Sequence, residues 1–426
     1  MDVIHQCCAG LDVHKKTIQA CVRRLGKRGK VAKEVRQFGT MTREILALAE
    51  WLSAEGVTHV AMESTGVFWK PIWNLLEGRF ELMLCNARDI KQVPGRKTDV
   101  KDCEWLAQLL QYGLLRASFV PPQPLRELGD LTRHRTQLVK ERTAVVNRIH
   151  KVLEDANIKL GSVASDVLGL SGRDRIQAII AGEDDPQRLA ALARRRLRGK
   201  IPQLRIALEG RVTEHHRFML KTLYRHLTEL EELIDEVGSQ IDRVIHSERL
   251  NGEFRGAGAI PFAGAAELLK TIPGVDDRSA ENILAELGTD MSRCPNAGHL
   301  ASWAGVCPGN NESAGKRKSG KTPKGNRWLR RTLSQAAWAG SRTKNSYTSA
   351  QYRRLCARRG KKRAVVAVAH SILVAVYHIL KTGQPYADLG ADHFDRLHPD
   401  RLKRYLVRRL EAMGHTVSLD AEERVA

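Results

Sequence analysis

The sequence predicts an α/β domain at the N-terminus, followed by a chain that is mainly α-helical. Three observations support this fold class: strand and helix patterns alternate up to residue 124, two long helical runs follow, and a basic, glycine-rich helical segment comes last. A chain of 426 residues can hold two or three domains. We expect domains at 1–124, 125–250 and 251–381, and a peripheral tail at 382–426.

The N-terminal segment alternates in a defined order. Apolar runs predict strands, and helical periodicity predicts helices. Thr42 is the expected N-cap of the first helix and Thr98 that of the last. Three strands, helix, strand, helix, strand, helix is the order of ribonuclease H-like folds. The predicted strands are 6–13, 17–24, 30–38, 59–63 and 81–85, and the predicted helices are 42–55, 68–76 and 99–112.

The second segment has apolar residues at alternating spacings of three and four, which predicts a coiled coil or an antiparallel helix pair. Arg135 and Arg142 interrupt the first run, which indicates an imperfect core or a site where two protomers exchange charge. Between the runs, the basic stretch 194–200 fits a nucleic-acid contact and a solvated helix end equally well. The first run is Leu128, Leu131, Arg135, Leu138, Arg142, Val145, Ile149 and Val152; the second is Leu220, Leu223, Leu227, Leu230, Ile234, Val237, Ile241 and Val244.

Charge is concentrated toward the C-terminus. The net charge is +22, and residues 251–426 contribute 29 basic and 16 acidic side chains. Within 316–363 there are 17 Lys or Arg and no Asp or Glu. A solvated surface normally mixes both signs, so a phosphate backbone is the expected partner of this run.

Composition also excludes several classes of protein. A hydrophobic content of 42% argues against a disordered polyelectrolyte. No uninterrupted apolar stretch is long enough for a membrane span, and the first residues lack the order of a secretion signal. The eight cysteines contain no C-x-x-C pair, so we expect no zinc ribbon and a reducing, cytoplasmic setting.

Four acidic residues occupy positions where carboxylates are costly without compensation. Asp12 ends the first predicted strand, Glu63 ends the fourth, and Asp99 and Asp102 share one face of the last helix. In a ribonuclease H-like sheet these elements are neighbours, so the four acids should converge. Convergent carboxylates favour Mg²⁺, with Mn²⁺ as an alternative, and two such ions can support phosphoryl transfer.

Basic residues and one histidine lie near these acids in the sequence. Arg96, Lys97 and Lys101 could steer a phosphate toward the acids. His14 is placed on the opposite face of the first strand and is not counted as a ligand.

A second candidate site lies in the glycine-rich segment 305–325. Residues 315–322 match the P-loop pattern, but no buried strand precedes them and no apolar helix follows, so nucleotide binding is not expected. We expect a flexible loop whose lysines surround a DNA phosphate, with a serine as candidate nucleophile. Ser313 and Ser319 are both eligible on chemistry alone.

Further nucleic-acid contacts are expected across the third segment. Residues 268–288 resemble a helix-hairpin-helix, whose turn at Gly274 could offer backbone N–H groups to a phosphate; an ordinary αα-corner is the alternative. The basic side chains expected on phosphates are Lys316, Arg317, Lys318, Lys321, Lys324, Arg327, Arg330 and Arg331.

Taken together, these motifs resemble the insertion-sequence 110 family of transposases, relatives of the Piv DNA invertases. Gly-Leu-Asp12-Val-His, Met-Glu63-Ser-Thr-Gly and Lys97-Thr-Asp99-Val-Lys-Asp102 match the family's DEDD motifs in order. Residues 268–287 and Trp303-Ala-Gly-Val-Cys-Pro-Gly match its C-terminal transposase domain. The resemblance covers nearly the whole chain.

The resemblance implies a RuvC-like nuclease domain, a dimerising coiled coil, and a tetrameric synaptic complex that acts on donor and target DNA. It implies a serine nucleophile that forms a 5′-phosphoserine intermediate, and a non-coding bridge RNA that pairs with both DNAs. Alignment with the family's serine segment places the nucleophile at Ser313, followed by Ala314 where relatives often have Gly. The expected setting is the bacterial cytoplasm, at the nucleoid. The insert 161–210 has no explanation in this chemistry.

Two other functions remain open from the residues. A metal-dependent nuclease resembling a Holliday-junction resolvase would use water as nucleophile and leave no protein–DNA bond. A non-catalytic nucleic-acid-binding protein would tolerate the loss of all four acids. The predicted recombinase differs from both in forming a covalent adduct.

Overall fold

The chain divides into two structural units, Met1–Pro121 and Pro122–Ala426. This computed structural model describes residues 2–26, 29–64, 66–87, 90, 102–253, 260–309, 311–397 and 399–419. It describes only the backbone of Glu253, Asn311, Glu312, Ser313, Arg317, Lys318 and Arg401. Arg96, Lys97, Thr98, Asp99 and Lys101 lie outside the described residues.

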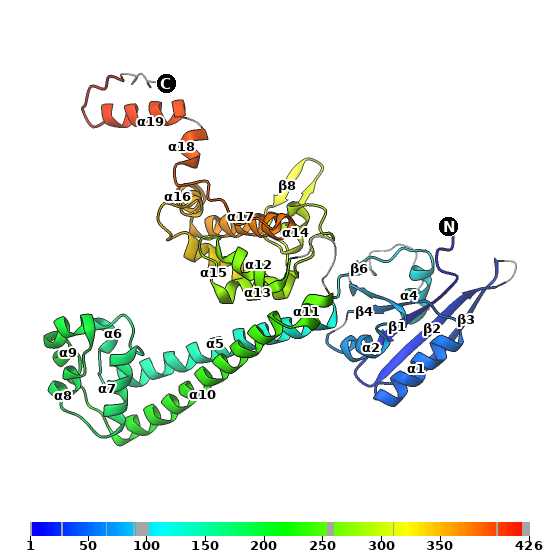
Figure 1. Cartoon of the computed structure of the whole chain (residues 1–426), viewed down its shortest axis with the longest axis horizontal. Coiled ribbons are helices and arrows are strands. Elements are labelled where there is room, and N and C mark those ends of the chain that lie inside the picture. The colour runs from blue at the N-terminus through cyan, green and yellow to red at the C-terminus, as the bar shows by residue number, and fades with distance from the viewer. Residues whose placement is uncertain are drawn as a thin grey trace. The chain divides into compact units, whose positions relative to one another are not determined.

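The first unit is built on a six-stranded sheet in the order β3-β2-β1-β4-β5-β6 (Figure 1). The three N-terminal strands pair antiparallel, and β1, β4 and β5 run parallel. This is the ribonuclease H-like arrangement, so the predicted fold class is confirmed. The strands are β1 (Cys7–Val13), β2 (Thr17–Leu25), β3 (Val31–Gly39), β4 (His59–Glu63), β5 (Glu81–Cys85) and the unpredicted β6 (Ala117–Ser118).

Helices cover both faces of this sheet. Odd-numbered β1 residues pack with α1 (Thr42–Ala54) and α2 (Trp69–Leu76), while Cys8 packs on the other face with α4 (Asp102–Gln111). The division follows from the two-residue period of a strand. The N-cap of α1 is Met41, which makes no side-chain cap, so the predicted cap at Thr42 is wrong by one residue.

Two long helices of the second unit, α5 (Gln123–Asp155) and α10 (Glu214–Ile245), run side by side (Figure 1). Leu125 and Leu128 share a core with Ile241 and Ile245, whereas Leu153 belongs to the core that holds Leu220. The start of α5 therefore packs against the end of α10. The two helices predicted from the three-four spacing form an antiparallel pair within one chain.

The two arginines of the first run make their contacts inside the chain. Arg135 is buried and pairs with Glu281 at 2.5 Å. Arg142 pairs with Glu231 of α10 at 2.7 Å, and Arg173 of the insert reaches the same carboxylate at 2.6 Å. The arginines therefore find acidic partners on facing helices of the same chain, and no second protomer is needed to compensate them.

We expect Glu231→Gln to destabilise this helical region by about 1–2 kcal/mol at neutral pH, because it weakens charge-assisted hydrogen bonds. Hydrogen bonds from Arg173 are the main cause that lowers the pKa of Glu231. A lowered folded-state pKa stabilises above the unfolded value and is lost as pH falls through the folded one. The difference between variant and wild type should therefore shrink in acid.

Urea unfolding followed by circular dichroism at neutral and acidic pH measures this effect. Glu229→Gln is the matched control, because Glu229 lies on the same helix and makes only an exposed contact to Arg225 at 3.7 Å. An equal loss in both variants, or a loss that does not depend on pH, would contradict the assignment.

The insert between the long helices shares one apolar core with α5 and α10. Within it Arg175 is fully buried and donates to the carbonyl oxygens of Leu189 and Ser171. The basic stretch forms η2 (Arg195–Lys200), and Arg194 before it pairs with Asp174 at 2.6 Å. The insert helices are α6 (Leu160–Val163), α7 (Leu170–Ile180), α8 (Pro186–Ala191) and α9 (Ile201–Ala207).

The C-terminal part is helical around a core that includes α17 (Lys361–Thr382). This helix is long and apolar enough to cross a membrane, but 56% of its most apolar window is buried inside the protein. Its apolar residues, such as Val368 and Ile372, fill the core between its neighbours. Those neighbours and the remaining helices are α11 (Glu248–Glu253), α12 (Phe262–Lys270), α13 (Asp277–Leu287), α14 (Ala297–Trp303), α15 (Arg327–Gly340), α16 (Tyr347–Arg359), α18 (His393–Leu397) and α19 (Pro399–Glu411).

Candidate active site

Three of the predicted acids lie on one face of the N-terminal sheet. Leu11 pairs with Met62 in the parallel strands β1 and β4. The next residue of each strand, Asp12 and Glu63, therefore lies at the same level near the carboxyl ends of the two strands. The strand period places both on the face where Cys8 and Ala61 pack, which is the face that α4 covers. Asp102 begins the described part of α4. The fourth acid, Asp99, lies outside the described residues.

Gly10 allows α4 to approach the sheet closely. A Cβ at this position would lie 2.4 Å from the carbonyl oxygen of Cys103 and 2.5 Å from the amide nitrogen of Ala107. Only glycine accommodates this approach. Gly10 lies two residues before Asp12, and it contacts Cys103, the residue after Asp102. The close packing therefore fixes the helix that carries one acid against the strand that carries another.

Gly10→Ala should lower the free energy of unfolding of the first unit by about 3 kcal/mol, because the helix backbone must move away from β1. Hydrogen exchange of peptides from β1 and α4 along a urea series would measure the loss. The control is Gly39→Ala in β3, whose added Cβ would meet only the end of the exposed Glu44 side chain. Equal protection in the two variants would contradict this role.

The electrostatics of Asp12 show that the three acids interact. Burial is the main cause that raises the pKa of Asp12. His14 lowers it, and the carboxylates of Asp102 and Glu63 raise it further. Asp12 therefore sits in a negative field, which a cation would relieve.

His14 contacts Asp12. Its Nε2 lies 3.2 Å from Oδ2 of Asp12, so the two side chains share a face, and the prediction of opposite faces was wrong. Residues two apart on a strand point the same way, and this simple period contained the correct signal. His14 is 63% exposed, which leaves it accessible at the edge of the acid cluster.

The donor chemistry of this cluster fits a hard divalent cation, because carboxylate oxygens are its preferred ligands. Within the described ranges, no three His, Cys, Asp or Glu side chains form a group that could hold a metal ion. Of the four predicted ligands, Asp12, Glu63 and Asp102 are described and Asp99 is not; together they are the residues that would hold the ion.

The serine segment forms a β-hairpin of β7 (Asn311–Ser313) and β8 (Lys316–Ser319), instead of the flexible loop expected. Ser313 pairs with Lys316 across a two-residue turn in which Ala314 has φ 50° and Gly315 has φ 72°. Positive φ at both positions is typical of hairpin turns. A glycine in place of Ala314 would adopt this conformation without steric cost.

Hydrogen bonding and close backbone packing fix the base of the hairpin. The amide of Gly309 donates to the carbonyl oxygen of Lys321 at 3.1 Å. A Cβ on Gly305 would lie 2.6 Å from the nitrogen of Gly325, so the two ends of the segment pack in contact. This strand pairing also excludes a P-loop, which needs a helix directly after its glycines.

A buried network connects the hairpin base to α5. Asn326 caps α15 by accepting from the amides of Trp328 and Leu329. Its side-chain amide donates to Glu286, which also accepts two hydrogen bonds from Arg133 of α5 at 2.8 and 2.9 Å. Glu286 is only 4% exposed, and its charge is compensated by Arg133. Sequence reasoning missed this network because its members come from three separate segments.

The predicted phosphate contacts differ in their surroundings. Arg330 donates to the carbonyl oxygen of Pro323 and to the hydroxyl of Thr322, so it braces the segment after the hairpin. The guanidinium of Arg327 lies 4.7 Å from the ring centroid of Trp328. Lys316, Lys321, Lys324 and Arg331 are exposed; Arg317 and Lys318 lie in β8, and their side chains are not described.

Gly274 occupies the turn between α12 and α13, with φ 93°. A Cβ there would lie 2.3 Å from the carbonyl oxygen of Ala336 and 2.4 Å from the nitrogen of Gly340, both in α15. The predicted helix–turn–helix is therefore present, and its first helix starts at Phe262, six residues earlier than expected. Glycine is required here by the contact with α15 as well as by the positive φ.

The ribonuclease H-like sheet with its acid cluster defines the first unit as a nuclease domain of the DEDD class. Residues 9–158 match the DEDD transposase family model of IS110, described as "Transposase". Residues 266–353 match the model "Transposase IS116/IS110/IS902 family". The two matches together cover more than half of the chain, which belongs to the IS110 family of transposases. No curated protein matches the chain.

Membership in this family makes the protein a DNA transposase that acts on DNA substrates. The DEDD match also indicates the use of a divalent metal ion.

Proposed function

We propose that this transposase cuts and rejoins DNA by attack of Ser313 on a phosphodiester, assisted by Mg²⁺ held by Asp12, Glu63, Asp99 and Asp102. The observation that carries the proposal is that one chain holds both halves of such a site. Asp12, Glu63 and Asp102 interact electrostatically on one sheet face, and Ser313 ends a strand in a basic hairpin. Mn²⁺ is the alternative metal.

The proposed step exchanges one phosphorus–oxygen bond for another. The Ser313 hydroxyl loses its proton, its oxygen bonds to phosphorus, and the bond from phosphorus to the 3′ oxygen breaks. The 3′ oxygen takes up a proton, which leaves a 3′-hydroxyl and a 5′-phosphoserine. Neighbouring cations such as Lys316 favour the anionic form of the nucleophile. The metal ion would neutralise negative charge on the reacting phosphate.

The resemblance to the family supports further parts of the proposal. A bridge RNA would pair with donor and target DNA, and dimers would assemble through the long helices into a tetramer. The protein would act in the bacterial cytoplasm, at the nucleoid. The divisions at 124, 250 and 381 are proposed as its domain boundaries, with the tail beyond 381 peripheral.

A denaturing gel of the full-length protein with labelled donor DNA tests the chemistry. Serine attack leaves DNA covalently attached to the protein, and the adduct should require Mg²⁺ and disappear in EDTA. Cleavage without any adduct would overturn the serine mechanism and favour a nuclease that uses water. Persistence of the adduct in EDTA would contradict the role of the metal.

Purification of the protein from cells that carry its element, followed by sequencing of bound RNA, tests the RNA partner. We expect one structured RNA species encoded next to the gene. Recovery of no enriched RNA would count against guidance by RNA while leaving the serine chemistry intact.

A further inference from the structure

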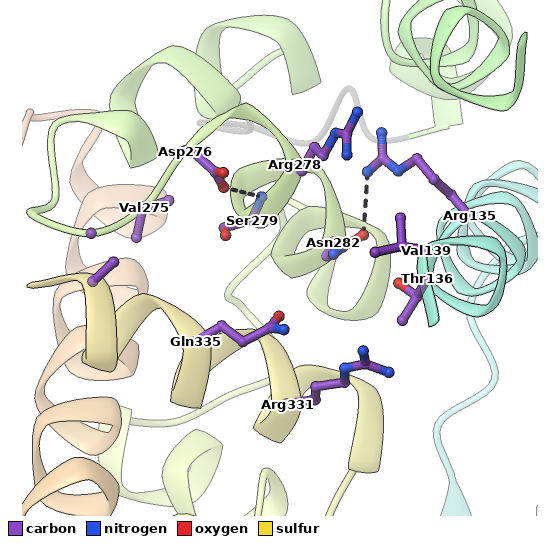
Figure 2. A pocket seen from close by; sticks show the side chains of 12 residues that line it. Arg135, Thr136, Val139, Val275, Asp276, Arg278, Ser279, Asn282, Arg331 and Gln335 are labelled. Atoms are coloured by element: carbon purple, nitrogen blue, oxygen red, sulfur yellow. Dashed lines mark hydrogen bonds between the residues drawn. The ribbon is translucent and has the colours of Figure 1, made fainter. Parts of the chain in front are cut away.

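A cleft of about 480 Å³ lies within the second unit, lined by α5, the start of α13 and α15 (Figure 2). No residue of the acid cluster or of the serine hairpin is among its described lining residues. Three arginines line it, one from each of these helices: Arg135, Arg278 and Arg331. Among the described residues that line it, Asp276 is the only acidic one.

Arg135 forms the fixed wall of the cleft. Its side chain is 5% exposed, pairs with Glu281 at 2.5 Å and donates to Asn282 at 3.4 Å (Figure 2). Glu281 compensates its charge, and burial is the main cause that raises the pKa of this glutamate. Arg135 therefore positions the wall, and its charge is already used within the protein.

Arg278 and Arg331 are available for a ligand. Both are exposed, and neither makes a hydrogen bond or an ion pair with another residue in the part of the chain that the structure describes. In Figure 2 the side chain of Arg278 extends from α13 and that of Arg331 from α15. Two guanidinium groups that line one cleft without an acidic partner among the described residues would repel each other less if an anion were bound there.

The remaining lining is polar and also suits an anion. Asp276 caps α13 by accepting from the amide of Ser279 at 2.9 Å. The first amides of this eleven-residue helix add partial positive charge at the same edge. The side-chain amide of Gln335 adds a donor from α15, whereas the Thr136 hydroxyl already donates to the carbonyl oxygen of Thr132 at 2.9 Å. The described residues that line the cleft include no aromatic side chain on which a base could stack, so its chemistry favours a phosphate over a base.

We propose that this cleft binds the phosphodiester backbone of a nucleic-acid strand, with Arg278 and Arg331 on the phosphates and Arg135 holding the wall. This deepens the nucleic-acid binding of the proposed function, but it does not depend on the serine chemistry. DNA and RNA present the same backbone phosphates, and the test separates them. Because phosphate contacts carry no sequence information, mixed-sequence probes are sufficient.

The test compares the full-length wild type with the double variant Arg278→Gln/Arg331→Gln. Binding to a labelled DNA duplex and to a labelled single-stranded RNA is measured by fluorescence anisotropy over a salt series. Loss of two phosphate contacts should weaken binding to at least one probe by about tenfold or more. It should also reduce the slope of log affinity against log salt by about 2.

The control is Arg188→Gln/Arg225→Gln, which removes the same charge from exposed helix positions outside the cleft lining, where the two arginines pair with Glu183 and Glu229. We expect its salt slope to stay within about 0.5 of wild type. A second variant, Gln335→Trp, narrows the cleft without changing its charge and should also weaken binding. Thermal melting checks that each variant folds.

A loss confined to one probe identifies the strand as DNA or RNA. Equal losses in the double variant and its control, or full binding by Gln335→Trp, would overturn the proposal. The Ser313→Ala variant keeps the failures distinct. It should retain the full salt slope, so a missing adduct reports on the serine and a reduced slope reports on the cleft.

Discussion

Ser313→Ala is expected to abolish the covalent protein–DNA adduct, with a loss of at least about 10³-fold, because alanine has no oxygen to attack phosphorus. The hairpin should persist, since Ser313 contributes its backbone to the pairing with Lys316. Nucleic-acid binding should therefore be unchanged. Adduct formation on a denaturing gel and binding by anisotropy measure the two properties separately.

Ser319→Ala is the matched control, and it also tests the rival nucleophile. Ser319 ends β8, and its Oγ accepts a hydrogen bond from the amide of Lys321 at 3.1 Å. This contact gives Ser319 a structural role in the turn after the hairpin. We expect the control to form the adduct. If Ser319→Ala loses the adduct while Ser313→Ala retains it, the assignment of the nucleophile is wrong.

Asp12→Asn is expected to reduce metal-dependent DNA cleavage by about 10²–10³-fold. Asparagine has nearly the same shape as aspartate but carries no charge, so it binds a divalent cation less well. Because burial and two neighbouring carboxylates already oppose the charge of Asp12, the substitution should not destabilise the first unit. Cleavage rates at several Mg²⁺ concentrations and a melting curve would show both effects.

Glu34→Gln serves as the control for this substitution. Glu34 is a carboxylate of the same sheet, on β3, where it pairs with Arg36 at 2.7 Å. Its loss removes one charge from the unit without touching the acid cluster, so cleavage should remain at the wild-type rate. Equal activity of Asp12→Asn and wild type at limiting Mg²⁺ would remove Asp12 from the metal site.

The sequence predicted the N-terminal fold well because each element carries a local signal. The pattern of apolar residues in the sequence predicts the strands to within one or two residues, and the predicted ends of β4 and β5 agree with the structure. β6 was missed, since two residues are too few to show a period. The serine segment was expected to be flexible, but its pairing depends on the turn at Ala314 and Gly315, a pattern weaker than Asn-Gly.

Residue pattern alone could nominate the acids, because a carboxylate at the end of an apolar strand is unusual. The partners of Arg135 and Arg133 could not be found this way. Glu281 and Glu286 lie well over a hundred residues away, and nothing local marks them as partners. The same is true of the cleft, because Arg278 and Arg331 are ordinary basic positions in the sequence and only the fold places both in its lining.

The sequence by itself determined which side chains are chemically able to act: the strand acids, the serines and the basic run. It determined them because strand period, helix period and charge are local properties. Only the tertiary structure decided that His14 contacts Asp12, that Gly10 brings α4 against β1, and that Arg278 and Arg331 line one cleft. Those are distances between segments, and they depend on how the helices and strands pack.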